Sequence, residues 1–139
     1  MQLPASTGCR REFKATVFTG LGEGAFYVSI YGKGFRHKLG ITPYPGTLNA
    51  RLADDDVEDF NKCLKSLEGT VIEPPEIPGV KLAPVMVYPA YINGIPVWIV
   101  RPQITVYKEN VVEFVAEENL RELLNLQDGD LLRIILGDP

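Results

Sequence analysis

The sequence predicts a mainly β protein whose strands close into a small barrel. Short apolar stretches alternate with polar residues at the period of a half-buried strand over much of the chain. Turn signals such as Asn93-Gly94, and the prolines between residues 74 and 78, separate these stretches. The chain lacks the regular strand–helix rhythm of a doubly wound parallel sheet. A closed barrel is therefore favoured, because closure removes exposed sheet edges.

The strand predictions start from residues 12–19, where Phe13, Ala15 and Val17 share one face. Asn93-Gly94 predicts a type I′ turn, and so a β-hairpin, because both positions tolerate positive φ angles. The predicted strands cover residues 12–19, 25–31, 47–52, 70–73, 80–92, 95–100, 111–116 and 131–136.

One longer and one short helix complete the prediction. Residues 54–67 carry apolar side chains at helical spacing after a cluster of aspartates, which suits an N-cap and first turn. Residues 117–124 form the short helix. Residues 20–24 are expected to join two strands, and residues 32–40 to form a basic connection bounded by glycines.

Size and composition fit one soluble domain over residues 1–139, with residues 1–11 as an irregular lead-in. The net charge of −4 and the lack of a basic stripe argue against nucleic acid as a partner. No apolar run approaches the ~20 residues of a membrane span, and no secretory signal is visible, so we expect a cytoplasmic protein. Cys9 and Cys63 have no zinc-like spacing; we expect Cys63 on the buried face of its helix, and a disulfide is disfavoured.

The glycine-rich loop Gly20-Leu21-Gly22-Glu23-Gly24 is a candidate phosphate cradle. Glycines let the backbone approach a ligand closely, and successive N–H groups form a nest for anions. The loop matches neither the GxxxxGK[ST] nor the GxGxxG pattern. An ordinary hairpin loop is the alternative.

Thr47 and Asn49 are candidate metal ligands. A strand would direct both side chains to one face. Their neutral oxygens are hard ligands of the kind that Mg²⁺ accepts, with waters and substrate phosphates completing the coordination. A polar, solvent-facing strand edge is the alternative.

Other candidates lie nearer the C-terminus. Glu113 stands in an otherwise apolar strand, where it faces solvent or accepts a proton from a substrate hydroxyl. Arg121 and the N–H groups at the start of the short helix suit a phosphate or a nucleobase edge, or are merely solvated.

Three motifs together resemble the archaeal CTP-dependent riboflavin kinases. They are Gly-Leu-Gly-Glu-Gly-Ala (20–25), Leu-Gly-Ile-Thr-Pro-Tyr-Pro-Gly-Thr-Leu-Asn (39–49) and Asn-Leu-Arg-Glu-Leu-Leu-Asn-Leu-Gln-Asp-Gly-Asp (119–130). The resemblance runs from about residue 14 to residue 136 and is weakest over residues 54–98. It implies a six-stranded cradle-loop barrel that makes FMN from riboflavin, with CTP as the phosphate donor and CDP as the second product.

The resemblance also implies roles for individual residues. Thr47 and Asn49 would ligate Mg²⁺, while Thr105 and Glu113 would contact the flavin, with Glu113 also the candidate catalytic base. The nucleotide would be held by Gly20, Leu21, Gly22, Glu23, Gly24 and Ala25 at its phosphates, and by Glu118, Asn119, Leu120 and Arg121 elsewhere. Residues 117–119 are more acidic and polar than the family pattern, which is harmless if residue 118 contributes only its backbone.

Other functions remain open from the residues alone. A non-catalytic barrel that binds flavin or DNA, and a kinase for a different vitamin alcohol, are the alternatives. The preference for CTP rests on the resemblance, because no residue pattern reads a cytosine edge. The sequence leaves the oligomeric state open, with a monomer slightly favoured.

Overall fold

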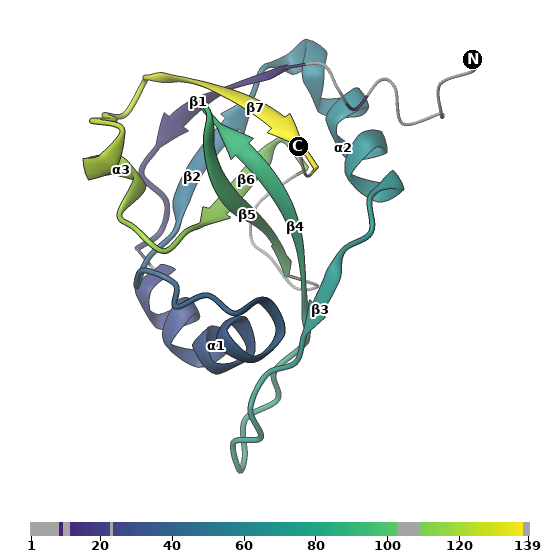
Figure 1. Ribbon diagram of the computed structural model, residues 1–139, viewed down its shortest axis with the longest axis vertical. Helices are drawn as coiled ribbons and strands as arrows, with labels where there is room; N and C mark the ends of the chain where they lie inside the picture. The colour runs from purple at the N-terminus through teal and green to yellow at the C-terminus, as the bar shows by residue number, and fades with distance from the viewer. Residues whose placement is uncertain (1–8, 10–11, 23, 103–108, 138–139) are drawn as a thin grey trace.

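Seven strands and three α-helices make up the described part of the chain in a computed structural model, which covers residues 9, 12–22, 24–102 and 109–137 (Figure 1). The strands are β1 (Phe13–Phe18), β2 (Leu48–Leu52), β3 (Thr70–Ile72), β4 (Val85–Ile92), β5 (Ile95–Pro102), β6 (Val111–Val115) and β7 (Leu131–Leu136). The helices are α1 (Gly24–Leu39), α2 (Val57–Ser66) and α3 (Leu120–Leu123), with a 3-10 turn, η2 (Asp54–Asp56), before α2.

Six of the strands close into an antiparallel barrel, as the sequence predicted. Around the barrel the order is β1-β2-β6-β5-β4-β7, and β7 pairs with β1 to complete the circle. The short strand β3 is an addition that pairs with one end of β4. Asn93 and Gly94 both have positive φ, which confirms the predicted tight turn between β4 and β5.

The barrel interior is filled with apolar side chains. Phe13, Ala15 and Val17 of β1 are buried while their neighbours Lys14 and Thr16 are exposed, so the predicted alternation is confirmed. Helix α2 packs against this interior core, chiefly through Phe60, Cys63 and Leu64. As far as the described residues go, the barrel interior is thus a packed apolar core, which favours a functional site on its outer wall or at its ends.

The prediction for residues 25–40 is wrong. The segment is one helix, α1, where we expected a strand over 25–31 and an irregular connection over 32–40. The alternation of Phe26, Val28 and Ile30 imitates a strand, yet the residues that become buried follow the helical period: Val28, Tyr31, Gly32 and Phe35.

Gly34 has a packing role within α1. A Cβ at this position would collide with the side chain of Ile72 in β3, so glycine allows the helix to approach the sheet closely. Helix α1 lies against the outer wall of the barrel (Figure 1). The contact makes a second apolar core, formed by Val28, Tyr31, Phe35, Ile72, Val85, Val87, Val100 and Val115.

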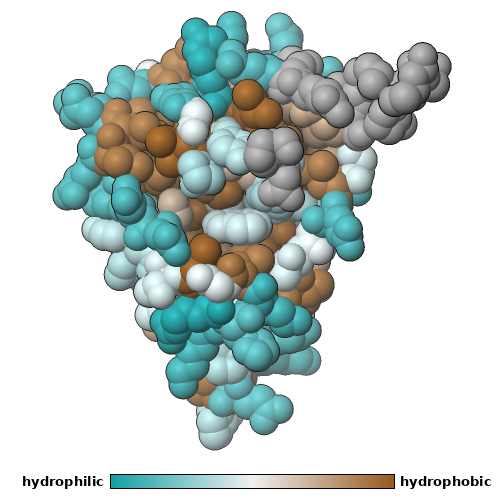
Figure 2. All heavy atoms as spheres, viewed as in Figure 1, coloured by the Kyte–Doolittle hydropathy of each residue, from teal (hydrophilic) through white to brown (hydrophobic). Residues whose placement is uncertain are grey.

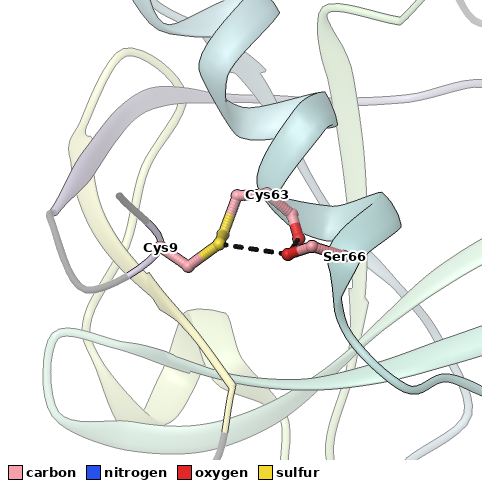
Figure 3. The surroundings of a disulfide bond; sticks show 3 residues. All are labelled: Cys9, Cys63 and Ser66. Atoms are coloured by element: carbon pink, nitrogen blue, oxygen red, sulfur yellow. Dashed lines mark hydrogen bonds between the residues drawn. A yellow bond between two sulfur atoms is a disulfide. The ribbon is translucent and has the colours of Figure 1, made fainter. Parts of the chain in front are cut away.

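Cys9 and Cys63 form a disulfide, which the sequence analysis disfavoured (Figure 3). Cys63 does lie on the buried face of α2, as expected. Ser66, one turn further along α2, donates a hydrogen bond to the Cys63 carbonyl and lies 3.4 Å from the Cys9 sulfur. The bond ties the N-terminal part of the chain to α2 across a sequence separation of 54 residues.

The aspartates before α2 do not act as the predicted cap, since no side-chain capping bond is found at this helix start. Asp56 is instead buried and accepts a hydrogen bond from the backbone N–H of Lys14 (2.8 Å). This bond links the start of α2 to β1. The predicted lead-in, residues 1–11, lies outside the described residues except for Cys9.

Apolar and hydrophilic groups are mixed on the face seen in Figure 2, where hydrophilic side chains are prominent at the narrow lower end. Among the described residues, no helix is both long enough and apolar enough to cross a bilayer.

Candidate active site

Asn49 and Glu113 stand side by side on the outer wall of the barrel. They are directly opposite each other in the antiparallel pair β2–β6, so their side chains leave the sheet on the same side. Phe18 of β1 continues this row beyond Asn49, and Val100 of β5 continues it beyond Glu113. Because Val100 packs in the second core beneath α1, the whole row faces the helix and not the barrel interior.

Thr47 completes a polar pair with Asn49. Its hydroxyl donates to Oδ1 of Asn49 at 3.4 Å, so the two oxygens lie together as the i, i+2 spacing predicted. Asn49 is only 8% exposed, so it is a buried polar residue and not the solvent-facing edge that we weighed as an alternative. Thr47 itself precedes β2, which begins at Leu48.

The start of α1 is pressed against this pair. A Cβ built on Gly24 would lie 2.6 Å from both the backbone nitrogen and the hydroxyl of Thr47, so only glycine fits there. The glycine loop therefore leads from β1 into the N-terminus of a helix, and not into a second strand as predicted. A loop that leads into a helix is a better candidate anion site than a loop between two strands, because the unpaired N–H groups and the dipole of a helix N-terminus attract negative charge.

The rest of the loop is open. Leu21 is 65% exposed, and Gly22 has a φ of 82°, a left-handed conformation that glycine adopts without strain. Ala25 lies in the first turn of α1. Glu23 and Thr105, two of the predicted ligand residues, lie outside the described residues.

The Thr47 and Asn49 oxygens fit one hard cation. Two neighbouring ligands of an octahedral Mg²⁺ ion, each about 2.1 Å from the metal, lie about 3 Å apart. The observed separation of 3.4 Å needs only a small adjustment to meet this value. No cluster of three or more His, Cys, Asp or Glu side chains suited to a metal occurs in the part of the chain that the structure describes.

A small pocket of about 70 Å³ brings Thr47 together with residues 118–121. These residues are remote in sequence, and their convergence was predicted only through the family resemblance. Tyr44 lines the same pocket, and its hydroxyl accepts a hydrogen bond from the Asn119 amide (3.1 Å). The lining residues are Tyr44, Gly46, Thr47, Leu48, Phe114, Ala116, Glu118, Asn119, Leu120 and Arg121.

The start of α3 differs from the predicted arrangement. The helix begins at Leu120, and the Asn119 side chain caps it by accepting from the N–H groups of Arg121 and Glu122. Those two N–H groups are thus already bound within the protein. What residues 118–121 offer a ligand is therefore mainly carbonyl groups, side chains and the remaining N–H groups.

Arg121 is held at the base of the glycine loop. Its guanidinium forms an ion pair with Asp128 at 2.7 Å and donates to the carbonyl of Phe18 at 3.3 Å. Thr19 also donates to the Asp128 carboxylate. The hydrogen bonds from Arg121 and Thr19 lower the pKa of Asp128, so this anchor stays charged at neutral pH. Arg121 thus fixes the end of β1, where the glycine loop starts.

An apolar groove of about 480 Å³ adjoins the small pocket, and sequence reasoning missed it. The two share Ala116, Glu118 and Leu120. Trp98, the only tryptophan in the chain, was a signal that the sequence offered, but its place on the outer wall depends on the barrel. The groove is lined by Ile41, Ile95, Pro96, Trp98, Ala116, Glu117, Glu118, Leu120 and Leu123.

Sequence reasoning also missed Tyr27, because it treated this segment as a strand. Tyr27 extends from α1 into the second core, with its ring 4.8 Å from that of Tyr31. Its buried hydroxyl has no hydrogen-bond partner among the described residues. Burial, followed by the nearby Tyr31 and Glu113, raises the pKa of Tyr27 well above its ordinary value, so the phenol stays protonated.

Comparison with known proteins identifies the family. A family model named CTP-dep_RFKase, described as a domain of unknown function, DUF120, matches residues 17–136. A riboflavin kinase from Aeropyrum pernix is 52% identical over 128 residues, which cover 91% of this chain and 96% of that protein. A riboflavin kinase from Staphylothermus marinus is 39% identical and covers 91% of this chain and 92% of its own length. A third, from Sulfolobus acidocaldarius, is 40% identical over 88% of this chain and 79% of its own length. The chain therefore belongs to the family of archaeal CTP-dependent riboflavin kinases.

Proposed function

We propose that this protein is a riboflavin kinase that transfers the γ-phosphoryl group of CTP to the 5′-hydroxyl of riboflavin, giving FMN and CDP. The observation that carries the proposal is the convergence at Thr47. Gly24, at the start of α1, packs against Thr47 without room for a side chain, and Asn49 lies within 3.4 Å of the Thr47 hydroxyl. The backbone that would bind phosphate, at the start of α1, thus adjoins the Thr47 and Asn49 oxygens that would bind a metal ion.

The glycine loop and the first turn of α1 would bind the nucleotide phosphates. Their N–H groups point out of a helix start, where partial positive charge accumulates. Because the loop is anchored through Arg121 and Asp128, its donors are positioned before the ligand arrives. Preorganised donors of this kind contribute most of the catalysis in phosphoryl transfer.

Thr47 and Asn49 would hold Mg²⁺. When bound, this ion neutralises charge on the phosphate oxygens. On the neighbouring strand, Glu113 would orient the acceptor hydroxyl and take up its proton as the new P–O bond forms. Its position directly opposite Asn49 supports this role, because acceptor and phosphate must meet in line.

The names of the relatives support riboflavin as the phosphate acceptor, and the name of the family model supports CTP as the phosphate donor. Each of the three compared proteins is named riboflavin kinase, and the match to the Aeropyrum pernix protein covers nearly the full length of both chains. CTP as donor comes from the name of the family model alone. The proposal for the donor is therefore the first to test.

The experiment incubates the purified protein with riboflavin and Mg²⁺, adding ATP, GTP, UTP or CTP separately, and resolves the flavins by chromatography. We expect FMN with CTP and very little with ATP. FMN from every nucleotide would keep the kinase and remove the preference for CTP. Riboflavin binding without FMN from any nucleotide would favour a non-catalytic flavin-binding barrel.

A further inference from the structure

The hydroxyl of Tyr27 is an unused polar group in an apolar setting. It is buried between α1 and the barrel wall, and no described residue accepts or donates a hydrogen bond to it. The neighbouring ring provides the contrast, because the Tyr31 hydroxyl donates to the carbonyl of Ala83 at 2.6 Å. An unpaired buried hydroxyl lowers stability, so a fold keeps one where it has another use.

The barrel register places Glu113 on the wall that Tyr27 faces. Val115 shares the face of Glu113 two residues along β6, and Val100 lies directly opposite Glu113 on β5. Both valines belong to the second core, against which Tyr27 packs. The phenol and the carboxylate therefore border the same space between helix and barrel. The electrostatic effect of Glu113 on Tyr27 agrees with this placement.

The pair has a specific chemical preference. An ionised carboxylate only accepts hydrogen bonds, whereas a protonated phenol donates one. Together they suit a group that donates and accepts from the same atom, which is the property of an alcohol hydroxyl. A hydroxyl would donate to Glu113 and accept from Tyr27. A carboxylate or phosphate ligand would be repelled by Glu113.

We propose that Tyr27 is a substrate-positioning residue whose hydroxyl, together with the carboxylate of Glu113, holds a hydroxyl of the ribityl chain of riboflavin. The inference rests on the proposed function, since it names a contact to the acceptor substrate. Tyr27 would fix one chain hydroxyl and so orient the acceptor toward the phosphate site at Thr47 and Asn49. The contact would recognise the sugar-alcohol chain of the acceptor.

The test compares Tyr27→Phe with Tyr31→Phe, because each substitution removes one oxygen atom from adjacent rings of α1. Riboflavin binding is measured without nucleotide through quenching of flavin fluorescence, and stability through the thermal unfolding temperature. We expect Tyr27→Phe to bind riboflavin about tenfold more weakly, as for the loss of one good hydrogen bond, with an unfolding temperature equal to or above that of the unsubstituted protein. Tyr31→Phe should show the reverse, with unchanged affinity and a lower unfolding temperature.

Lumiflavin, which has the flavin ring but no chain hydroxyls, is the control ligand. Tyr27→Phe should bind lumiflavin as well as the unsubstituted protein does. Equal riboflavin affinity of the variant and the unsubstituted protein would overturn the inference, and so would an equal loss of lumiflavin affinity. A lower unfolding temperature of Tyr27→Phe would also overturn it, by revealing a partner within the fold. An unsubstituted protein that binds no riboflavin would overturn the proposed function itself.

Discussion

A buried polar side chain on the outer barrel wall, Asn49, distinguishes this site at the scale of single residues. Asn49 is 8% exposed, and its strand neighbours Leu48 and Ala50 are buried in the barrel core. A buried amide is costly unless its polar atoms are used, so its place beside Thr47 and opposite Glu113 calls for a function.

Replacing Asn49 tests the proposed role of Thr47 and Asn49 as metal ligands. We expect Asn49→Ala to lose at least ~10²-fold in kcat, comparable to deleting one preorganised electrostatic contact, with a smaller change in KM for riboflavin. Steady-state kinetics with CTP and Mg²⁺ measure both. Asn61→Ala is the matched control, because Asn61 lies on α2 and its amide donates to the carbonyls of Val57 and Glu109. Turnover near that of the unsubstituted protein would refute the metal assignment.

Replacing Glu113 tests its proposed role as the proton acceptor. Glu113→Gln keeps the size of the side chain but cannot take up a proton, so we expect kcat to fall by about 10²-fold or more while riboflavin still binds. Single-turnover rates and riboflavin titrations separate the two effects. An unchanged rate with weakened riboflavin binding would reduce Glu113 to a binding residue.

At the scale of elements, α1 is the element whose type the sequence pattern predicted wrongly. Phe26, Val28 and Ile30 alternate as in a strand, and Gly32 and Gly34 resemble helix breakers. Tertiary contacts decide that the segment is a helix. Gly34 allows close contact with Ile72, and the buried residues of α1 pack against the barrel wall. None of this is local, so sequence period alone could not reveal it.

Two glycine substitutions in α1 should have opposite effects. An added Cβ at Gly24 meets the backbone and hydroxyl of Thr47 at 2.6 Å, so Gly24→Ala must displace the glycine loop from Thr47, the proposed metal ligand. We expect a loss on the order of 10²-fold in kcat/KM, since small misplacements are costly in catalysis. At Gly32 a Cβ meets nothing within 4 Å.

Gly32→Ala is therefore the control, and it should raise the free energy of unfolding by about 0.5–1 kcal/mol with activity unchanged. Enzyme assays and denaturant unfolding of both variants measure these effects. Full activity in Gly24→Ala would show that the loop does not depend on this contact.

The disulfide is the element-scale feature with the largest expected effect on stability. Closing a loop of 54 residues restricts the unfolded chain, which corresponds to about 4 kcal/mol in the chain-entropy treatment. Thermal unfolding with and without dithiothreitol should therefore differ by about 10–15 °C. The Cys9→Ala variant should unfold at the lower temperature and be insensitive to reductant. A reductant effect that persists in this variant would have another cause.

At the scale of the whole molecule, the barrel was predictable and the site was only partly so. The strands β1, β3, β6 and β7 lie where they were predicted: β1, β6 and β7 bury side chains in the barrel core, and β3 buries Ile72 in the second core. The proximity of the Thr47 and Asn49 side chains was predicted from their spacing, and their role as metal ligands stays a prediction. Tyr27 and the Trp98 groove were not, since their positions depend on how α1 and the ends of the barrel strands meet.

Ligand-induced stabilisation gives a test of the whole assembly. CTP that binds only the folded protein should raise its stability by about 2.7 kcal/mol at one hundred times its dissociation constant. If Thr47 and Asn49 hold Mg²⁺ beside the phosphates, EDTA should remove most of the rise in unfolding temperature caused by CTP. The rise caused by riboflavin should remain. A CTP effect that survives EDTA would separate nucleotide binding from the metal.

The segment between Phe18 and Leu48 has a consequence for how such proteins diversify. β1 and β2 are neighbours in the sheet, yet the chain leaves the barrel between them to form the glycine loop and α1 before it returns. None of the described residues of this segment takes part in the strand pairing of the barrel, although the backbone N–H of Tyr44 donates to the carbonyl of Ala116 just beyond β6 (2.8 Å). Relatives can therefore differ in the length and sequence of this segment without a shift in the register of any strand, provided that a helix still covers the second core.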